Sequence, residues 1–134
     1  MKKGFGLAML VLVVGLALVG CGGTGEDPTV AFCGALTELN ETSPTIAALG
    51  EAADLAQIVQ LGAAMDNNWM DLTNAVEQLD DATTQAAFAP YDEQYTAIPA
   101  ITQETAMVAA RTTLDAKNAI AMNAYAELYP MHCE

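Results

Sequence analysis

The feature of this sequence that most constrains its fold is a set of apolar residues spaced alternately three and four positions apart. Its members are Leu55, Ile58, Gly62, Met65, Trp69, Leu72, Val76 and Leu79. Eight successive positions with this spacing lie along one face of a single helix of about 25–30 residues. Because that face is apolar along its whole length, it must be covered by packing partners. Gly62 within the face would let a neighbouring backbone approach closely.

The residues before this helix predict another helix, which begins at Pro28. Asp27 can cap its N-terminus, and a proline suits the first helical position. Its apolar stripe consists of Phe32, Leu36 and Leu39. The polar segment 40–44, which ends in a proline, is expected to break the helix. A turn or a short helix would then occupy residues 44–49.

Two further amphipathic segments follow in the second half of the chain. Between residues 83 and 98, helical spacing is kept by Phe88, Tyr91, Tyr95 and Ile98. Pro90 and Pro99 are expected to limit this segment to short pieces. A last long helix is predicted from about residue 100 to residue 128, where Pro130 ends it. Its apolar face carries Met107, Leu114, Ala121, Tyr125 and Leu128.

Composition decides the fold class. Residues 21–134 contain 24 alanines and no run in which β-branched or aromatic residues alternate with polar ones. Such a composition favours helices over strands. Amphipathic segments joined by short connections bury their apolar faces most simply by packing side by side. We therefore predict an all-α fold for residues 28–134, a small antiparallel helical bundle of three to four helices.

The N-terminal segment has the organisation of an export signal. Lys2 and Lys3 form a short basic start, and an uninterrupted apolar run of 13 residues covers positions 7–19. The sequence Leu18-Val19-Gly20-Cys21 follows. In this setting it resembles the lipobox of bacterial lipoproteins, in which a specialised peptidase cleaves before the cysteine.

The resemblance implies that residues 1–20 are a signal peptide and that Cys21 carries the lipid. Residues 21–27 would form a flexible tether, and the lipid would anchor the domain to a bacterial membrane outside the cytoplasm. Gly22 in place of an aspartate would favour the outer membrane if two membranes are present. The alternative is an uncleaved membrane anchor, but 13 apolar residues fall short of the about 20 that a span needs.

Two further cysteines, Cys33 and Cys133, remain once Cys21 is assigned to the lipid. Two leftover cysteines in a small exported domain usually pair, so we expect one disulfide that closes the bundle. It would close a loop of about 100 residues and contribute about 4–5 kcal/mol in a chain-entropy treatment. The alternative is that both thiols stay free as soft metal ligands.

The charge of the chain excludes several classes of function. Residues 21–134 carry two cations, Arg111 and Lys117, against 17 acids, a net charge of −15. Such a polyanion cannot neutralise the phosphates of a nucleic acid. The single histidine excludes zinc motifs built on two histidines, and GxGxxG, GxSxG, CxxC and P-loop motifs are absent. We therefore expect no enzymatic activity and no cofactor.

Aromatic residues offer the best candidate ligand site, because two pairs of tyrosines lie four positions apart on predicted helices. A pocket for a small apolar or cationic ligand would be lined by Trp69, Tyr91, Tyr95, Arg111 and Tyr125. The alternative is ordinary packing, in which the tyrosines cover the bundle. Arg111 would then lay its stem over apolar surface and pair with Asp115 or Glu104.

Metal binding has weaker support in the sequence. Met131-His132-Cys133 places three soft or borderline ligands side by side, but this set loses its best ligand if the cysteine is disulfide-bonded. The acid pairs Asp80-Asp81 and Asp92-Glu93 lack the spacing of a calcium loop. We therefore expect no metal site.

These patterns together predict a noncatalytic interaction or structural module of the cell envelope, which contacts a protein partner through an exposed helix face. The long apolar face of residues 55–79 also suggests self-association. The alternative function is a lipoprotein that binds a small ligand or a metal in a pocket between its helices. An internal pocket near Trp69 and Arg111 would favour that alternative, and a solidly packed core would argue against it.

Overall fold

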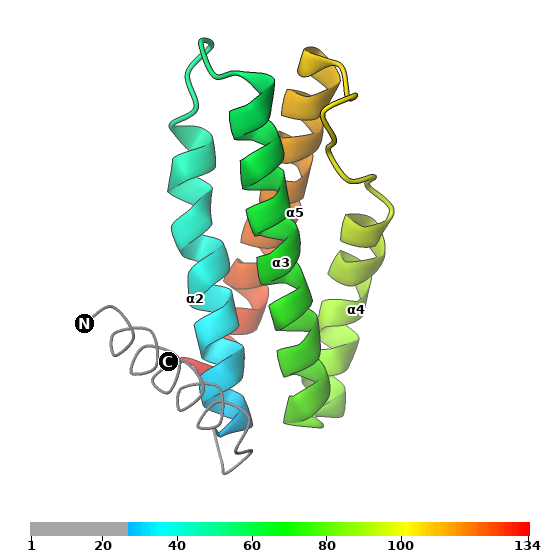
Figure 1. Ribbon diagram of the computed structural model, residues 1–134. Helices are drawn as coiled ribbons and strands as arrows, with labels where there is room; N and C mark the ends of the chain where they lie inside the picture. Colours follow the sequence, from blue (N-terminus) through cyan, green and yellow to red (C-terminus); the bar gives the residue numbers. More distant parts are fainter. Residues whose placement is uncertain (1–26) are drawn as a thin grey trace, which may run out of the picture.

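The structure, a computed structural model, describes residues 27–134 and has an all-α fold (Figure 1). Its helices are α2 (Pro28–Ala47), α3 (Leu55–Leu79), α4 (Ala82–Thr96) and α5 (Met107–His132). Successive helices run in opposite directions, which is the antiparallel bundle that the sequence predicts. Within residues 27–134, no helix combines the length and the apolar character needed to cross a membrane. The expected signal peptide, lipobox and nearly all of the tether lie outside the described residues.

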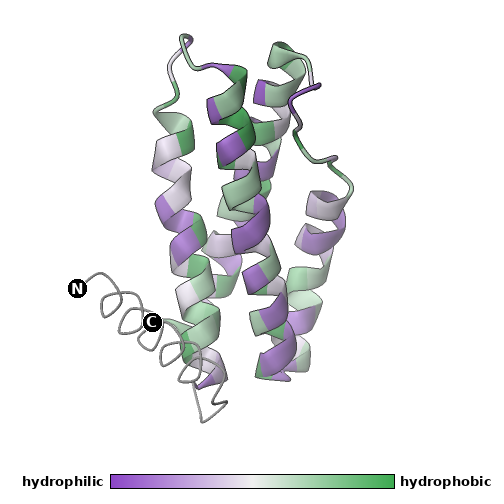
Figure 2. Cartoon of the chain, viewed as in Figure 1, coloured by the Kyte–Doolittle hydropathy of each residue, from purple (hydrophilic) through white to green (hydrophobic). Residues whose placement is uncertain are grey.

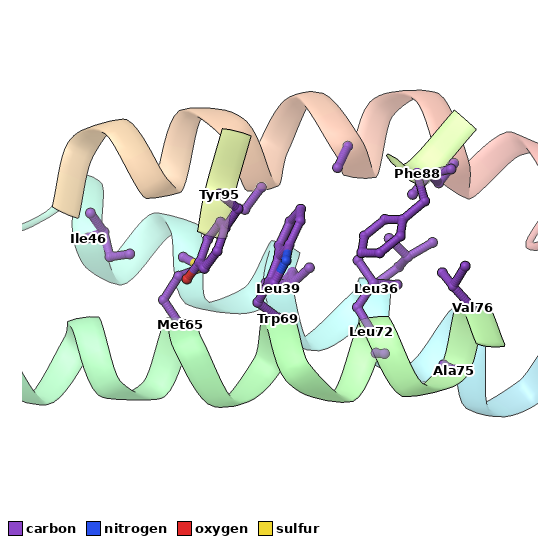
Figure 3. Packing of buried hydrophobic residues seen from close by; sticks show 14 of the residues in the cluster. Leu36, Leu39, Ile46, Met65, Trp69, Leu72, Ala75, Val76, Phe88 and Tyr95 are labelled. Atoms are coloured by element: carbon purple, nitrogen blue, oxygen red, sulfur yellow. The ribbon is translucent and has the colours of Figure 1, made fainter. Parts of the chain in front are cut away.

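The helix α3 supplies the middle of the hydrophobic core, and its bounds coincide with those of the predicted apolar face. The positions of that face from Ile58 to Val76 are all buried, and Leu55 and Leu79 pack against the same core. Figure 3 shows four side chains of this face meeting residues of α2 and α4 between the helices: Met65, Trp69, Leu72 and Val76. Hydrophilic residues are interspersed with hydrophobic ones along the helices, as expected of amphipathic segments (Figure 2). The face is therefore covered by packing partners within one bundle.

The predicted disulfide between Cys33 and Cys133 is present. The Cα atoms of the two cysteines lie 5.6 Å apart, although 100 positions separate them in the sequence. The bond joins the first half of α2 to the end of α5, so both ends of the described chain lie at the same end of the bundle (Figure 1). The alternative of two free thiols does not hold.

Three helices continue through prolines that were expected to end or divide them. Pro44 lies inside α2, Pro90 inside α4 and Pro130 inside α5. Each proline is exposed, and so is the residue four positions earlier, whose carbonyl group loses its backbone donor. At such exposed positions water can bond a carbonyl group that lacks its backbone donor, so each helix continues past its proline. The break expected at residues 40–44 and the short pieces expected in 83–98 are therefore wrong.

The last helix begins later than expected, because residues 97–106 form a connection instead of its first turns. A local turn holds this connection, in which the backbone N–H of Thr102 donates to the hydroxyl of Thr105 at 3.0 Å. Ile101 is buried against α3, and a Cβ atom on Gly62 would lie 3.1 Å from its Cδ1 atom. The glycine therefore makes room for a side chain of this connection and not for the backbone of another helix.

Candidate functional site

A surface groove between α3 and α4, here called the Trp69 groove, gathers the most distinctive polar and aromatic residues of the described bundle. It has a volume of about 410 Å³ and opens to solvent, so it is not the enclosed pocket considered above. Helical spacing places its α3 residues on one face, and the connection after α4 closes one end. The lining residues that carry the argument below are Asp66, Trp69, Met70, Asp92, Tyr95 and Lys117.

Stacked aromatic rings form the floor of the groove. The rings of Trp69 and Tyr95 lie 4.2 Å apart between centroids and are almost parallel, with an interplanar angle of 4°. Phe88 extends the stack on the other side of Trp69, at a centroid distance of 5.3 Å, and Figure 3 shows the three rings in a row above α3. Both Trp69 and Tyr95 are buried, so chiefly their edges are available to the groove. The stack fixes α4 on α3 and makes the floor rigid.

An ion pair with a buried lysine joins α5 to α3 at the groove. The side chain of Lys117 is 3% exposed, and its Nζ atom lies 2.6 Å from Oδ1 of Asp66, whose side chain is 34% exposed. The hydroxyl of Tyr95 donates to the same Oδ1 atom at 2.8 Å, and Lys117 Nζ lies 4.9 Å from the centre of the Tyr95 ring. Burial and the hydrogen bond to Asp66 raise the pKa of Tyr95 far above its usual range. One carboxylate therefore holds side chains from α4 and α5.

The groove keeps one negative charge that no described cation balances. Asp92 accepts the indole N–H of Trp69 with Oδ1 at 2.9 Å, while its Oδ2 atom has no hydrogen-bond partner among residues 27–134. Lys117 compensates the charge of Asp66, so the charge of Asp92 is the surplus. A carboxylate held in place by a tryptophan and open on its other oxygen is a preorganised acceptor for a donor or a cation.

The five residues predicted to line one pocket are only partly brought together. Trp69 and Tyr95 meet in the groove, but the hydroxyl of Tyr91 donates to Glu127 on α5, which raises the pKa of that tyrosine. Tyr125 packs on Tyr129, with ring centroids 4.9 Å apart. Arg111 donates to the backbone carbonyl of Gly50 at 2.6 Å and forms no ion pair with Asp115 or Glu104.

Sequence reasoning missed the two residues that organise the groove, Asp66 and Lys117. A signal for the lysine was present, because it stands three positions after Leu114 and four before Ala121 and so interrupts the apolar face of the last helix. A cation at such a position needs a buried partner. No comparable signal pointed to Asp66, because an acid on a long helix is usually solvated.

A second polar cluster lies at the end of the bundle that holds the disulfide. Asp81 caps α4 and accepts hydrogen bonds from the backbone N–H and the hydroxyl of Thr84, and these bonds lower the pKa of Asp81 below its ordinary value of 3.8. The Nε2 atom of His132 lies 2.8 Å from Thr84 Oγ1 and 3.4 Å from Asp81 Oδ2. Because the threonine proton goes to Asp81, the histidine donates through Nε2. Thr84 is fully buried, so this arrangement joins α4 to α5 and presents no nucleophile.

The structure also shows the positions of the residues that were considered as metal ligands. The sulfur of Cys133 is bonded to Cys33, so Met131-His132-Cys133 offers no thiolate. Within residues 27–134 there is no group of three or more His, Cys, Asp or Glu side chains arranged to hold a metal ion. The acid pairs Asp80-Asp81 and Asp92-Glu93 belong to a helix cap and to the groove.

No protein family model, no curated protein and no solved structure matches the chain. The function is therefore argued from the geometry of the groove and of the exposed surface.

Proposed function

We propose that this protein is a lipid-anchored, extracytoplasmic helical-bundle module of a bacterial cell envelope, which acts without catalysis by contacting a protein partner. The lipobox-like sequence ending in Cys21 supports the anchor. The disulfide between Cys33 and Cys133 fits an oxidising compartment. The net charge of −15 in residues 21–134 would hold the domain away from anionic lipid headgroups and leave its surface free for a partner.

The observation that carries the partner-binding proposal is an exposed apolar pair at the start of α5. Met107 is 41% exposed and Val108 is 80% exposed. The helix α5 begins at the end of the bundle opposite to the start of α2, where the described residues begin (Figure 1). Arg111 fixes the neighbouring connection through the carbonyl of Gly50. An exposed apolar pair at the end of the bundle opposite to Pro28, the helix start that follows the proposed anchor in the sequence, suits contact with a protein.

Site-specific photocrosslinking of the full chain in its bacterium tests the partner. A photoreactive amino acid at position 108 is expected to give a crosslinked adduct of defined mass, whereas the same amino acid at the exposed position 86 of α4 should give none. Adducts from both positions, or from neither, would argue against a partner at the start of α5. An adduct of twice the mass of the chain would indicate self-association instead of contact with a different protein.

Metabolic labelling with palmitate tests the anchor separately. Label is expected in the wild type and should disappear in Cys21→Ala. The variants Cys33→Ala and Cys133→Ala serve as matched controls, because they remove a cysteine without touching the lipobox-like sequence. Label that persists in Cys21→Ala would contradict the anchor.

A second candidate function is the binding of a small ligand, and the Trp69 groove favours it. The groove combines an aromatic floor, the exposed side chain of Met70 and the open oxygen of Asp92. Its volume of about 410 Å³ lies within the range of ligand sites, which is about 300–1,000 Å³. Binding would take place at the surface between α3 and α4, since the core beneath is packed.

A further inference from the structure

We infer that the Trp69 groove binds a small organic cation, a protonated amine with a compact apolar body. The inference deepens the second candidate function and is independent of the lipid anchor and of the partner at the tip of α5. Three features of the groove carry it: the apolar contact surface, the charge balance and the rigidity of the acceptor.

The apolar body of the ligand would lie along the α3 side of the groove. Met70 is 56% exposed there, although it directly follows a buried tryptophan on the helix. The edges of Trp69 and Tyr95 and the partly buried Ile98 continue this surface. Aromatic edges beside a flexible thioether adapt to an aliphatic group of modest size. The groove can therefore contact the apolar body of a ligand as well as its charged group.

The charge balance of the groove selects a cation. Asp66, Asp92 and Lys117 all line it, and Lys117, which is 3% exposed, neutralises only one of the two carboxylates. The remaining negative charge adds to the field of a domain with a net charge of −15 in residues 21–134. An anion would be repelled by the uncompensated carboxylate of Asp92, and a neutral molecule would leave Asp92 without a counter-charge.

The acceptor is also preorganised. Oδ1 of Asp92 is occupied by the indole N–H of Trp69, which fixes the orientation of the carboxylate. Its Oδ2 atom is then the one that an ammonium group would meet. The hydroxyls of Thr73 and Thr96 line the same groove, and each donates within its own helix, to the carbonyls of Trp69 and of Asp92. Their oxygen atoms keep free lone pairs, which can accept further N–H donors of the ligand.

Tryptophan fluorescence provides a direct test, because Trp69 is the single tryptophan of the chain and forms the groove floor. The full-length protein would be titrated with three probes of one shape: cyclohexylammonium, cyclohexanol and cyclohexanecarboxylate. A saturable spectral change is expected with the ammonium probe, and none is expected with the carboxylate. The alcohol is expected to bind at least about tenfold more weakly than the ammonium probe. Added salt should weaken the binding of the ammonium probe.

Two matched variants assign the effect to the groove. Asp92→Asn keeps an acceptor for the indole N–H but removes the charge, and we expect at least about fivefold weaker binding of cyclohexylammonium. Glu93→Gln removes the same charge from the next, exposed residue of α4 and should change the affinity by less than about twofold. Met70→Lys places a tethered ammonium at the exposed edge and should abolish binding even if Asp92→Asn fails to fold.

Every outcome decides between the proposals. If none of the three probes changes the fluorescence, the groove is not a ligand site and the second candidate function fails with the inference. If cyclohexanol binds as tightly as cyclohexylammonium, the groove binds ligands but the cation inference is wrong. An equal loss of affinity in Asp92→Asn and Glu93→Gln would also overturn it, because binding would then depend on the net charge of the domain and not on the carboxylate of Asp92.

Discussion

At the scale of single residues, the bundle depends on one unequal ion pair. Lys117 is 3% exposed while the side chain of Asp66 is 34% exposed, so the two charges depend on each other to different degrees. Water can solvate the aspartate if the lysine is lost, but nothing can solvate the ammonium if the aspartate is lost. Asp66 also accepts the hydroxyl of Tyr95, so its removal affects three helices at once.

This inequality predicts different costs for the two halves of the pair. Asp66→Asn should lower the free energy of unfolding by about 3 kcal/mol or more, because a buried ammonium loses its counter-charge. Lys117→Met should stay within about 1 kcal/mol of the wild type, because methionine fills the space of the stem and Asp66 remains hydrated. Urea unfolding at neutral pH measures both variants. Equal losses of unfolding free energy in the two variants would contradict the expectation that the lysine depends on its partner more than the aspartate does.

Tyr95 predicts a loss of stability at high pH. Burial and the hydrogen bond to Asp66 raise the pKa of its hydroxyl in the folded state above the ordinary value of 10.0. The folded state therefore holds this proton more tightly, so the stabilisation is complete below pH 10.0 and is lost as the pH rises above it. Tyr95→Phe should cost about 1–2 kcal/mol at neutral pH, because one hydrogen bond to a carboxylate is lost.

The difference between wild type and Tyr95→Phe should shrink as the pH is raised. Urea unfolding of both proteins at about pH 8 and about pH 11 measures this change. Tyr125→Phe is the matched control, because Tyr125 packs on Tyr129 and makes no hydrogen bond to a carboxylate within the described residues. A difference for Tyr95→Phe that is constant with pH would mean that its hydroxyl titrates as an exposed one.

At the scale of the helices, the sequence predicted the features that follow from apolar periodicity, and it failed for helix ends that depend on exposure to solvent. The apolar spacing predicted the bounds of α3 correctly, because the spacing of the residues on a buried helix face is visible in the sequence. Whether a proline ends a helix depends on the exposure of the carbonyl four positions earlier, which is set by tertiary packing. The same holds for the groove: Trp69 and Tyr95 meet because α4 packs beside α3, and spacing along one helix cannot show which neighbour it faces.

The prolines inside the helices offer a test at this scale. Pro90→Ala should raise the free energy of unfolding by about 1–3 kcal/mol, since it restores a backbone donor and removes a ring clash in the middle of α4. Pro99→Ala, in the connection after α4, should instead lower it by up to about 1 kcal/mol through a more flexible unfolded chain. Chemical unfolding of both variants distinguishes the two signs. A loss of stability in Pro90→Ala would contradict this expectation and show that the proline stabilises α4.

At the scale of the whole molecule, the disulfide determines how the bundle is closed. Cys33 and Cys133 bind α2 to the end of α5, and beside them His132 binds the end of α5 to the start of α4. The sequence predicted the pair by counting cysteines, which was enough because only two remained after Cys21 was assigned. It could not predict the contact of His132, because that depends on where α4 begins in space.

Removal of the disulfide should have the largest effect of any change considered. The double variant Cys33→Ala/Cys133→Ala is expected to lose about 4–5 kcal/mol of stability, because the loop that becomes open spans about 100 residues. Such a loss is comparable to the whole stability of a small domain. Urea unfolding of this variant, and of the wild type with and without reductant, measures the loss. A reduced wild type as stable as the oxidised protein would contradict the expectation.

The placement of this bond also sets the order of events when the chain is made. Cys33 leaves the ribosome 100 residues before its partner, so its thiol waits, unpaired, while α3, α4 and α5 are synthesised. The local pairing of α2 with α3 can form during this time, because their contacts need no later residue. The covalent closure comes only when α5 has been completed and, in the exported protein proposed above, only once the chain has reached an oxidising compartment.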